Sequence, residues 1–346
     1  GIIKMGFTKD KKDRIKKYIL EKINEGATDI VKKTADSFDI SLNTVYRYIR
    51  ELEIDNIIKR ESGKLSFILH HNDFQLIRSN GDLQDESFIY DNLLEEKVKD
   101  LPKNIVSIWQ YAFTEMMNNA IDHSAAEIVS VSIFQSYMDT SVIIQDNGIG
   151  IFQKIKEFYH YDSLDDAVGE LFKGKLTTDS ENHSGEGIFF TSRILDGFLA
   201  ISAGKIFTHN KYHDDLDDLQ NNPELKELIG DKGTVIFMKL SNFSNKILKE
   251  VFDMFADVDG GFTKTHISIK NYFDDFPVSR SQARRLTHRF EDFEEIELDF
   301  DGVDEIGQGF AHELFVVFQN AHKNIKLIPS NTTNDVKRMI HHVTVN

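Results

Sequence analysis

The sequence contains no cysteine, which excludes disulfide bonds, thiolate metal sites and cysteine nucleophiles and is consistent with a reducing compartment. It also lacks any apolar run long enough to cross a bilayer, and no signal peptide is recognisable. With no cysteine to act as a ligand, no zinc site is expected. These absences predict a cytoplasmic protein without membrane contact.

Positive charge is scarce and unevenly distributed. The formal net charge of −16 argues against a chain that coats nucleic acid along its whole length. Residues 1–72 nevertheless carry 15 Lys and Arg against 11 Asp and Glu, a net charge of +4, which leaves −20 for the other 274 residues. This asymmetry indicates a first module that faces nucleic acid, attached to a body that repels it.

The first module, residues 8–72, is expected to contain three helices and a hairpin. Apolar spacing predicts a helix over residues 9–24, a second helix that is capped by Thr28 and ends near Phe38, and a third that follows the N-cap Ser41. Two short strands with a tight turn follow within residues 57–69. This order resembles the winged helix-turn-helix family, whose third helix enters the major groove of DNA.

That resemblance implies a set of DNA contacts on the outward side of the third helix and on the hairpin. The candidates are Asn43, Thr44, Arg47, Tyr48, Arg50 and Lys64. The alternative is a protein-interaction or dimer module. Residues 73–100 are expected to form a helical connector, with a dimer contact as the alternative.

An apolar helix around residues 108–121 carries an unusual polar edge. Glu115 and Asn119 are four residues apart and Asp122 follows three later, so a helix places all three along one side. Carboxylate and amide groups beside a core lose water and need partners. A ligand is the expected partner.

Three further motifs follow this helix in order. They are "SVIIQDNGIGI" (141–151), a strand that runs into a glycine turn, "SGEGIFFTSRI" (184–194), in which glycines open a helix, and "GTVIFMKL" (233–240), a buried strand. With the helix, these motifs resemble the GHKL ATPase superfamily over residues 104–241. The resemblance implies an ATP-binding α/β sandwich over residues 101–243.

The resemblance also implies roles for particular residues. Asn119 would coordinate Mg²⁺ that bridges the phosphates of ATP, and Glu115 would orient or deprotonate the attacking water or hydroxyl. Asp146 would accept a hydrogen bond from the adenine amino group. The remaining residues assigned to the nucleotide site are Asp122, Gly148, Gly150, Lys175, Gly185, Gly187 and Thr234.

The segment 172–187 would be a lid over ATP. Its Lys173 and Lys175, together with Arg193, are candidates to reach the terminal phosphate, but a solvated surface charge is the favoured interpretation for each.

Strands and helices alternate from residue 262 onward, which predicts a small α/β domain with a parallel sheet within residues 244–346. Strands are expected at 266–272 and 295–300, with a helix over 279–290 between them. The run 299–314 resembles STAS-like domains, partners of anti-sigma serine kinases. Residues 306–309 carry no hydroxyl where a phosphorylated serine would lie, so a docking or dimerisation surface is expected.

The fold class expected overall is multidomain α+β. The favoured function is an Mg-ATP-binding switch that binds DNA through residues 8–72, with slow ATP hydrolysis, a homodimeric state and a protein partner at the STAS-like domain. One alternative is a serine protein kinase of the anti-sigma type that acts on a separate partner. Another is an ATPase of a bacterial defence or stress system.

Overall fold

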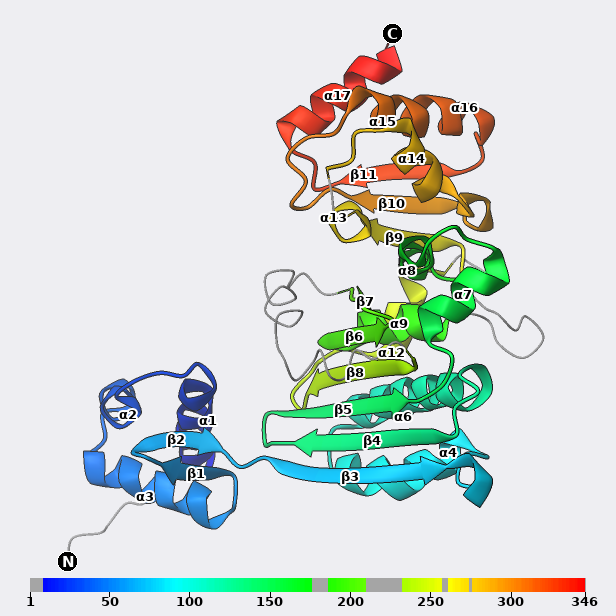
Figure 1. Cartoon of the computed structure of the whole chain (residues 1–346). Coiled ribbons are helices and arrows are strands. Elements are labelled where there is room, and N and C mark those ends of the chain that lie inside the picture. The colour runs from blue at the N-terminus through cyan, green and yellow to red at the C-terminus, as the bar shows by residue number, and fades with distance from the viewer. Residues whose placement is uncertain (1–8, 176–185, 210–231, 257–260, 274–275, 346) are drawn as a thin grey trace, which may run out of the picture. The chain divides into compact units, whose positions relative to one another are not determined.

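The structure is a computed structural model that describes residues 9–175, 186–209, 232–256, 261–273 and 276–345 (Figure 1). The chain divides into two compact units, residues 1–72 with 133–140, and residues 73–132 with 141–346. None of the helices in the described part of the chain has the length and apolar composition that crossing a bilayer requires.

The first unit contains three helices and a two-stranded antiparallel hairpin. Its elements are α1 (Lys9–Asn24), α2 (Ile30–Phe38), α3 (Leu42–Ile54), β1 (Ile58–Glu61) and β2 (Lys64–Phe67). Apolar residues at helical spacing close a small core, to which all three helices and β1 contribute. The unit thus has the order of elements that the sequence predicts.

Local hydrogen bonds fix where these helices begin. The hydroxyl of Ser41 accepts the backbone N–H of Thr44 at 3.2 Å, so Ser41 is the N-cap of α3, as predicted. The N-cap of α2 is Asp29, in the left-handed conformation, and not Thr28. The turn between β1 and β2 uses positive φ angles at Ser62 and Gly63.

A six-stranded sheet, formed by strands between residues 70 and 241, is the centre of the next part of the chain. Its strands are β3 (His70–Ile77), β4 (Ile128–Gln135), β5 (Asp139–Asp146), β6 (Gly197–Ser202), β7 (Lys205–Phe207) and β8 (Thr234–Ser241). They lie in the order β3-β4-β5-β8-β6-β7. Residues 73–77, expected in a helical connector, therefore belong to an edge strand. Alternate residues of β4 and β5 are buried, as in a sheet covered on one face.

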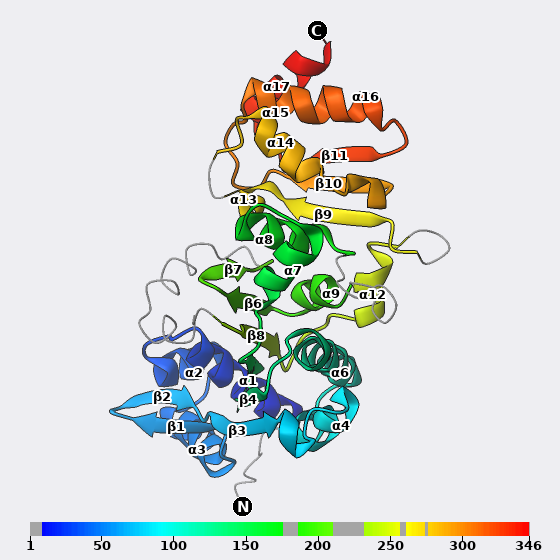
Figure 2. The same ribbon diagram turned by 45° about the vertical axis from the view of Figure 1, so that its right-hand side comes forward.

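A layer of helices packs on this sheet (Figure 2). Those in contact with one another are α4 (Glu86–Tyr90), α6 (Lys103–Asn118), α9 (Gly187–Ile194) and α12 (Leu248–Asp253). A π-helical turn (Asn119–His123) extends α6, and a second such turn (Asp91–Glu95) with α5 (Glu96–Val98) follows α4. Two further helices, α7 (Ile151–Tyr159) and α8 (Leu164–Lys173), follow β5 in the chain.

The C-terminal part of the second unit has a three-stranded sheet. Its strands are β9 (Lys264–Ser268), β10 (Glu295–Asp299) and β11 (Lys326–Ser330), with β10 in the middle and parallel to both neighbours. The accompanying helices are α13 (Ile269–Tyr272), α14 (Arg280–Thr287), α15 (Gln308–His312), α16 (Gln319–Ala321) and α17 (Asn334–Val345). The predicted parallel sheet is confirmed. The predicted strand 266–272 ends early, because the Ser268 hydroxyl accepts the N–H of Asn271 and starts α13.

Helix α8 lies between the two sheets and contacts both β7 and β9. Its Lys173 is fully buried, with Nζ 2.7 Å from Oε1 of Glu170 and 2.6 Å from the carbonyl oxygen of His288. Nη1 of Arg289 lies 3.1 Å from the other oxygen of Glu170. Burial lowers the pKa of Lys173 to about 8 and outweighs the attraction of Glu170. One buried carboxylate thus holds two cations.

Replacement of that carboxylate should be costly. In Glu170→Gln, Lys173 and Arg289 lose their shared counter-ion inside the protein, and we expect the free energy of unfolding to fall by about 3 kcal/mol or more. Urea denaturation measures the change. The control is Asp253→Asn, which breaks the exposed pair of Asp253 with Lys249 and should have little effect. Equal stability of Glu170→Gln and the unmodified chain would contradict this view of the network.

Candidate functional site

Strand β5 ends in Asp146, a residue only 8% exposed. Its Oδ1 accepts the N–H of Gly148 at 2.8 Å, and Thr234 donates both its N–H and its hydroxyl to the carboxylate. Burial raises the pKa of Asp146, and these three hydrogen bonds offset part of that rise. A carboxylate has about four acceptor positions, and the described residues occupy three of them at Asp146.

Thr234 connects this carboxylate to the next helix. Its Oγ1 accepts the N–H of Ile151, the first residue of α7, at 2.9 Å. Thr234 lies at the start of β8, which neighbours β5 in the sheet. One threonine therefore fixes the end of β5, the start of β8 and the start of α7.

The glycines after Asp146 are needed for contacts within the chain. A Cβ on Gly148 would lie 2.0 Å from the carbonyl oxygen of Ser124. Gly150 has a φ of 93°, and a Cβ there would lie 2.5 Å from Oγ of Ser202. Close packing of the protein itself thus requires both glycines, independently of any ligand.

Sequence reasoning missed two residues that hold this glycine turn in place. The carbonyl oxygen of Ser124, at the end of the π-helical turn, accepts the N–H of Ile149 at 2.8 Å. The side chain of Asn147 accepts the N–H groups of Glu127 and Ile128, at 3.1 and 3.0 Å. In the sequence, the sign of these contacts was the polar residue Asn147 inside the glycine motif, and such a residue indicates only a turn.

The predicted catalytic residue and the predicted phosphate helix lie together. A Cβ on Gly187, the first residue of α9, would lie 2.2 Å from Oε2 of Glu115. The carboxylate therefore lies over the first turn of α9, where the helix dipole favours negative charge. Burial, and then the charges of Glu115 and Glu186, raise the pKa of nearby Tyr111.

Asn119 and Asp122 lie where α6 gives way to the π-helical turn. Asn119 is half-buried, with its amide nitrogen 4.0 Å from Sδ of Met116. Asp122 is exposed. The wider turn changes the angular spacing that a regular helix would have given, so Asp122 departs from the straight edge that the sequence suggested.

The candidate cations are not surface charges. Lys173 is fully buried against Glu170, and Arg193 is half-buried, with Nη2 donating to the carbonyl oxygens of Phe172 and His266 at 3.1 and 2.9 Å. The surface interpretation is therefore wrong for both. Lys175 is placed with its Nζ 2.8 Å from the carbonyl oxygen of Asp292. Gly185 and most of the predicted lid lie outside the described residues.

One residue of the predicted DNA-binding face is placed differently from expectation. Tyr48 is fully buried in the core of the first unit, so the prediction that it faces outward is wrong. The reason is helical spacing, since the buried positions of α3 are Val45, Tyr48, Ile49 and Leu52.

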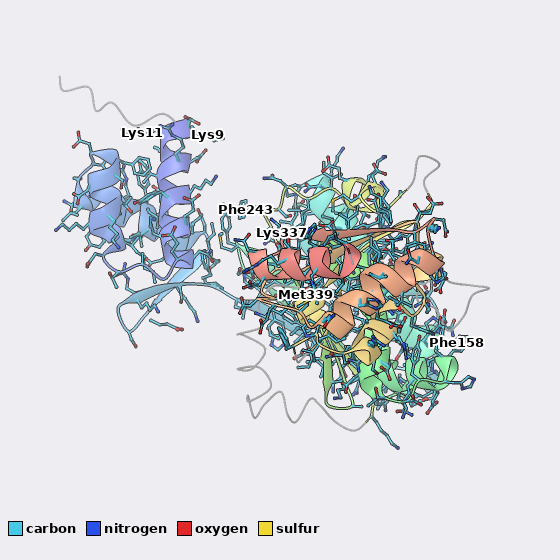
Figure 3. All side chains as sticks on the ribbon, turned by 90° about the horizontal axis from the view of Figure 1, so that it is seen from above. Lys9, Lys11, Phe158, Phe243, Lys337 and Met339 are labelled. Carbon is cyan, nitrogen blue, oxygen red and sulfur yellow. The ribbon has the colours of Figure 1, made fainter. Side chains whose placement is uncertain are left out.

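The tyrosine that does face outward is Tyr46, which is 50% exposed and which sequence reasoning missed. It lies three residues after Asn43 and four before Arg50, so a helix places these exposed residues on one side. Arg47, also exposed, lies four residues after Asn43 and three before Arg50. Thr44 is half-buried, and Lys64 is exposed on the hairpin. In addition, α1 begins with Lys9 and Lys11, whose side chains extend from its end (Figure 3).

The start of α15, where STAS-like relatives would carry a phosphorylated serine, is closely covered. The N–H of Gly307 donates to the carbonyl oxygen of Pro277 at 2.9 Å, and the N–H of Phe310 donates to that of Val278 at 3.1 Å. A Cβ on Gly307 would lie 2.5 Å from Cα of Val278. Nearby Asp299 accepts the N–H of Asp301, as a turn-forming residue does. Among the described residues, no three or more His, Asp or Glu side chains are grouped so that they could hold a metal ion.

Comparison with known proteins identifies one part of the chain. Residues 282–337 match the model of a STAS-like domain of unknown function, which confirms the STAS-like prediction for the C-terminal domain. No curated protein matches the chain. The chain is therefore a mixed α/β protein with a C-terminal STAS-like domain.

Proposed function

We propose that the protein is an Mg-ATP-binding switch of the GHKL type that binds DNA through a winged helix-turn-helix. The arrangement around Asp146 is the observation that carries the nucleotide part. A buried carboxylate is suited to an adenine amino group, and it is fixed by Thr234 and by the turn that begins at Gly148.

The residues expected on the phosphate side support the same proposal. The first turn of α9 begins at Gly187 beside Glu115, and backbone N–H groups at a helix start suit a phosphate. Mg²⁺ prefers oxygen ligands, and the amide oxygen of Asn119 supplies one without negative charge beside a triphosphate. Bound Mg²⁺ would neutralise phosphate charge, while Glu115 would take the proton of the attacking water.

The DNA part is supported by the exposed stripe of α3. Asn43, Tyr46, Arg47 and Arg50 provide donors for phosphates and base edges on one side of a helix. The positive charge of residues 1–72 favours the same contact, while the acidic remainder of the chain disfavours DNA elsewhere.

A serine protein kinase is the second candidate. At the start of α15 the chain's own STAS-like domain supplies no acceptor, because residues 306–309 lack a hydroxyl and Gly307 packs against Val278. A kinase of this type would therefore act on a separate protein. Transfer of labelled phosphate from ATP to a partner distinguishes this candidate from simple hydrolysis.

Nucleotide binding tests the proposal first. In titration calorimetry with Mg²⁺ and a non-hydrolysable ATP analogue, Asp146→Ala should bind about 10- to 100-fold more weakly, because a hydrogen bond to a charged group is lost. Asp139→Asn, at the other end of β5, is the control and should bind normally. Unchanged affinity in Asp146→Ala would remove the adenine assignment.

Acid should weaken nucleotide binding in the unmodified chain. Because the pKa of Asp146 is raised, protonation begins above the ordinary value of about 3.9, and affinity should fall as the pH is lowered toward that raised value. Acid unfolding driven by Asp146 does not explain this loss of affinity. A raised pKa means that the folded state binds the proton more tightly than the unfolded state, so protonation of Asp146 stabilises the fold. An affinity that is independent of pH over this range would contradict the assignment.

Hydrolysis should depend on Glu115 more than binding does. Glu115→Gln keeps the size of the side chain but removes the base, so turnover should fall about 100-fold or more while binding of the analogue persists. Asn119→Ala should instead lose the Mg²⁺ dependence of binding. Steady-state phosphate release and calorimetry with and without Mg²⁺ measure the two effects. Equal turnover in Glu115→Gln and the unmodified chain would rule out the catalytic role.

DNA binding should depend on the exposed stripe of α3. Arg47→Ala should weaken binding to mixed-sequence duplex DNA and lower the slope of log affinity against log salt by about 1, because one phosphate contact is lost. Arg14→Ala, on α1 of the same unit, removes the same charge and is the control. If both variants bind alike, net charge rather than the α3 face would be responsible.

A further inference from the structure

The STAS-like domain bonds to the end of α8, directly before residues 176–185. Nη2 of Arg289 donates to the carbonyl oxygens of Lys175 and Gly174, at 2.8 and 3.3 Å. The hydroxyl of Thr265, on β9, donates to the carbonyl oxygen of Lys173 at 2.7 Å. Three consecutive carbonyl groups at the end of α8 are therefore held by the C-terminal domain.

The same domain bonds to α9, directly after residues 176–185. Arg193 extends from α9, and its Nη2 joins the carbonyl oxygen of His266 on β9 to that of Phe172 on α8. Its guanidinium carbon lies 3.4 Å from the ring centroid of Phe189. Arg193 is half-buried, and burial of its guanidinium lowers its pKa, so this cation is stabilised by carbonyl groups and an aromatic ring in addition to water.

These contacts act on the residues assigned to phosphate. Helix α9 has eight residues and begins at Gly187, beside Glu115, so its placement sets where the Gly187 backbone meets the carboxylate. A short helix held at Arg193 moves as a unit. Any shift of β9 or Arg289 is therefore passed to both described stretches that flank residues 176–185.

We infer that Arg193 and Arg289 are positioning residues through which the STAS-like domain sets the nucleotide affinity of the second unit. The inference rests on the proposed function. Coupling between two sites is reciprocal, so nucleotide must also stabilise these contacts of the C-terminal domain. A protein partner bound to that domain would then change nucleotide affinity without touching the nucleotide.

Of Arg193 and Arg289, Arg289 is the better residue to substitute, because its removal does not leave Glu170 without a positively charged neighbour. Glu170 faces both Lys173 and Arg289, so Arg289→Gln leaves one buried anion with one buried cation. The matched control is Arg284→Gln, on the same domain, whose ion pair with Glu313 stays within the domain. Arg289→Lys keeps the charge beside Glu170 but lacks the planar fork that reaches two carbonyl oxygens.

The test measures binding of Mg²⁺ with a non-hydrolysable ATP analogue to the full chain and its three variants. We expect Arg284→Gln to bind within about twofold of the unmodified chain, and Arg289→Gln at least about 5-fold more weakly. Arg289→Lys should restore thermal stability but not affinity. Hydrogen exchange at residues 264–268 and 280–292 should slow on nucleotide binding in the unmodified chain and not in Arg289→Gln.

The outcomes separate the two hypotheses. Binding by the unmodified chain with equal affinity in Arg289→Gln, or full rescue of affinity by Arg289→Lys, would overturn the positioning role and leave the proposed function intact. Absence of binding by a folded, unmodified chain would overturn both.

Discussion

A buried negative charge at the end of β5 organises the central sheet. Asp146 is almost fully enclosed and accepts hydrogen bonds from Gly148 and Thr234. An enclosed carboxylate is stable only with such partners, so β8 must begin beside the end of β5. The same closeness restricts β8 itself, since a Cβ on Gly233 would lie 2.0 Å from the carbonyl oxygen of Asp146.

Sequence periodicity predicted those elements that have one buried face. The boundaries of α1 and the Ser41 cap followed from apolar spacing and a capping residue, and β5, β8 and α9 were expected at their motifs. The prediction for Tyr48 was wrong because it gave the polar hydroxyl more weight than the position of the residue in the apolar stripe of α3. Spacing should have decided, since a buried tyrosine mostly contributes apolar surface.

What the sequence could not predict depends on contacts between distant segments. From the sequence alone, Lys173 and Arg193 resemble surface residues. Their charged ends are covered only because α8 and α9 pack against β9 and the loop that follows α14. The π-helical turn at Asn119 also has no local signal in the sequence. Local patterns therefore located the candidate site, and long-range packing decided which charges reach it.

Burial of these cations changes the electrostatic character of the second unit. Lys173 and Arg193 count toward the formal charge of the chain, but their positive ends face the interior. Buried carboxylates nevertheless outnumber buried cations among the described residues of this unit, since Asp146, Glu170, Asp299 and Glu313 are all enclosed. Burial therefore removes more negative than positive charge from the outer surface of the second unit, which is less acidic than its formal charge suggests.

The covered start of α15 has a consequence for how this domain could evolve. Gly307 leaves no space for a side chain, because the backbone of Val278 lies against it. A single change to serine at this position would therefore not create a phosphorylatable site, since the hydroxyl would have to displace the segment that leads into α14. Regulation by a phosphate at position 307 would require that segment to be remodelled first.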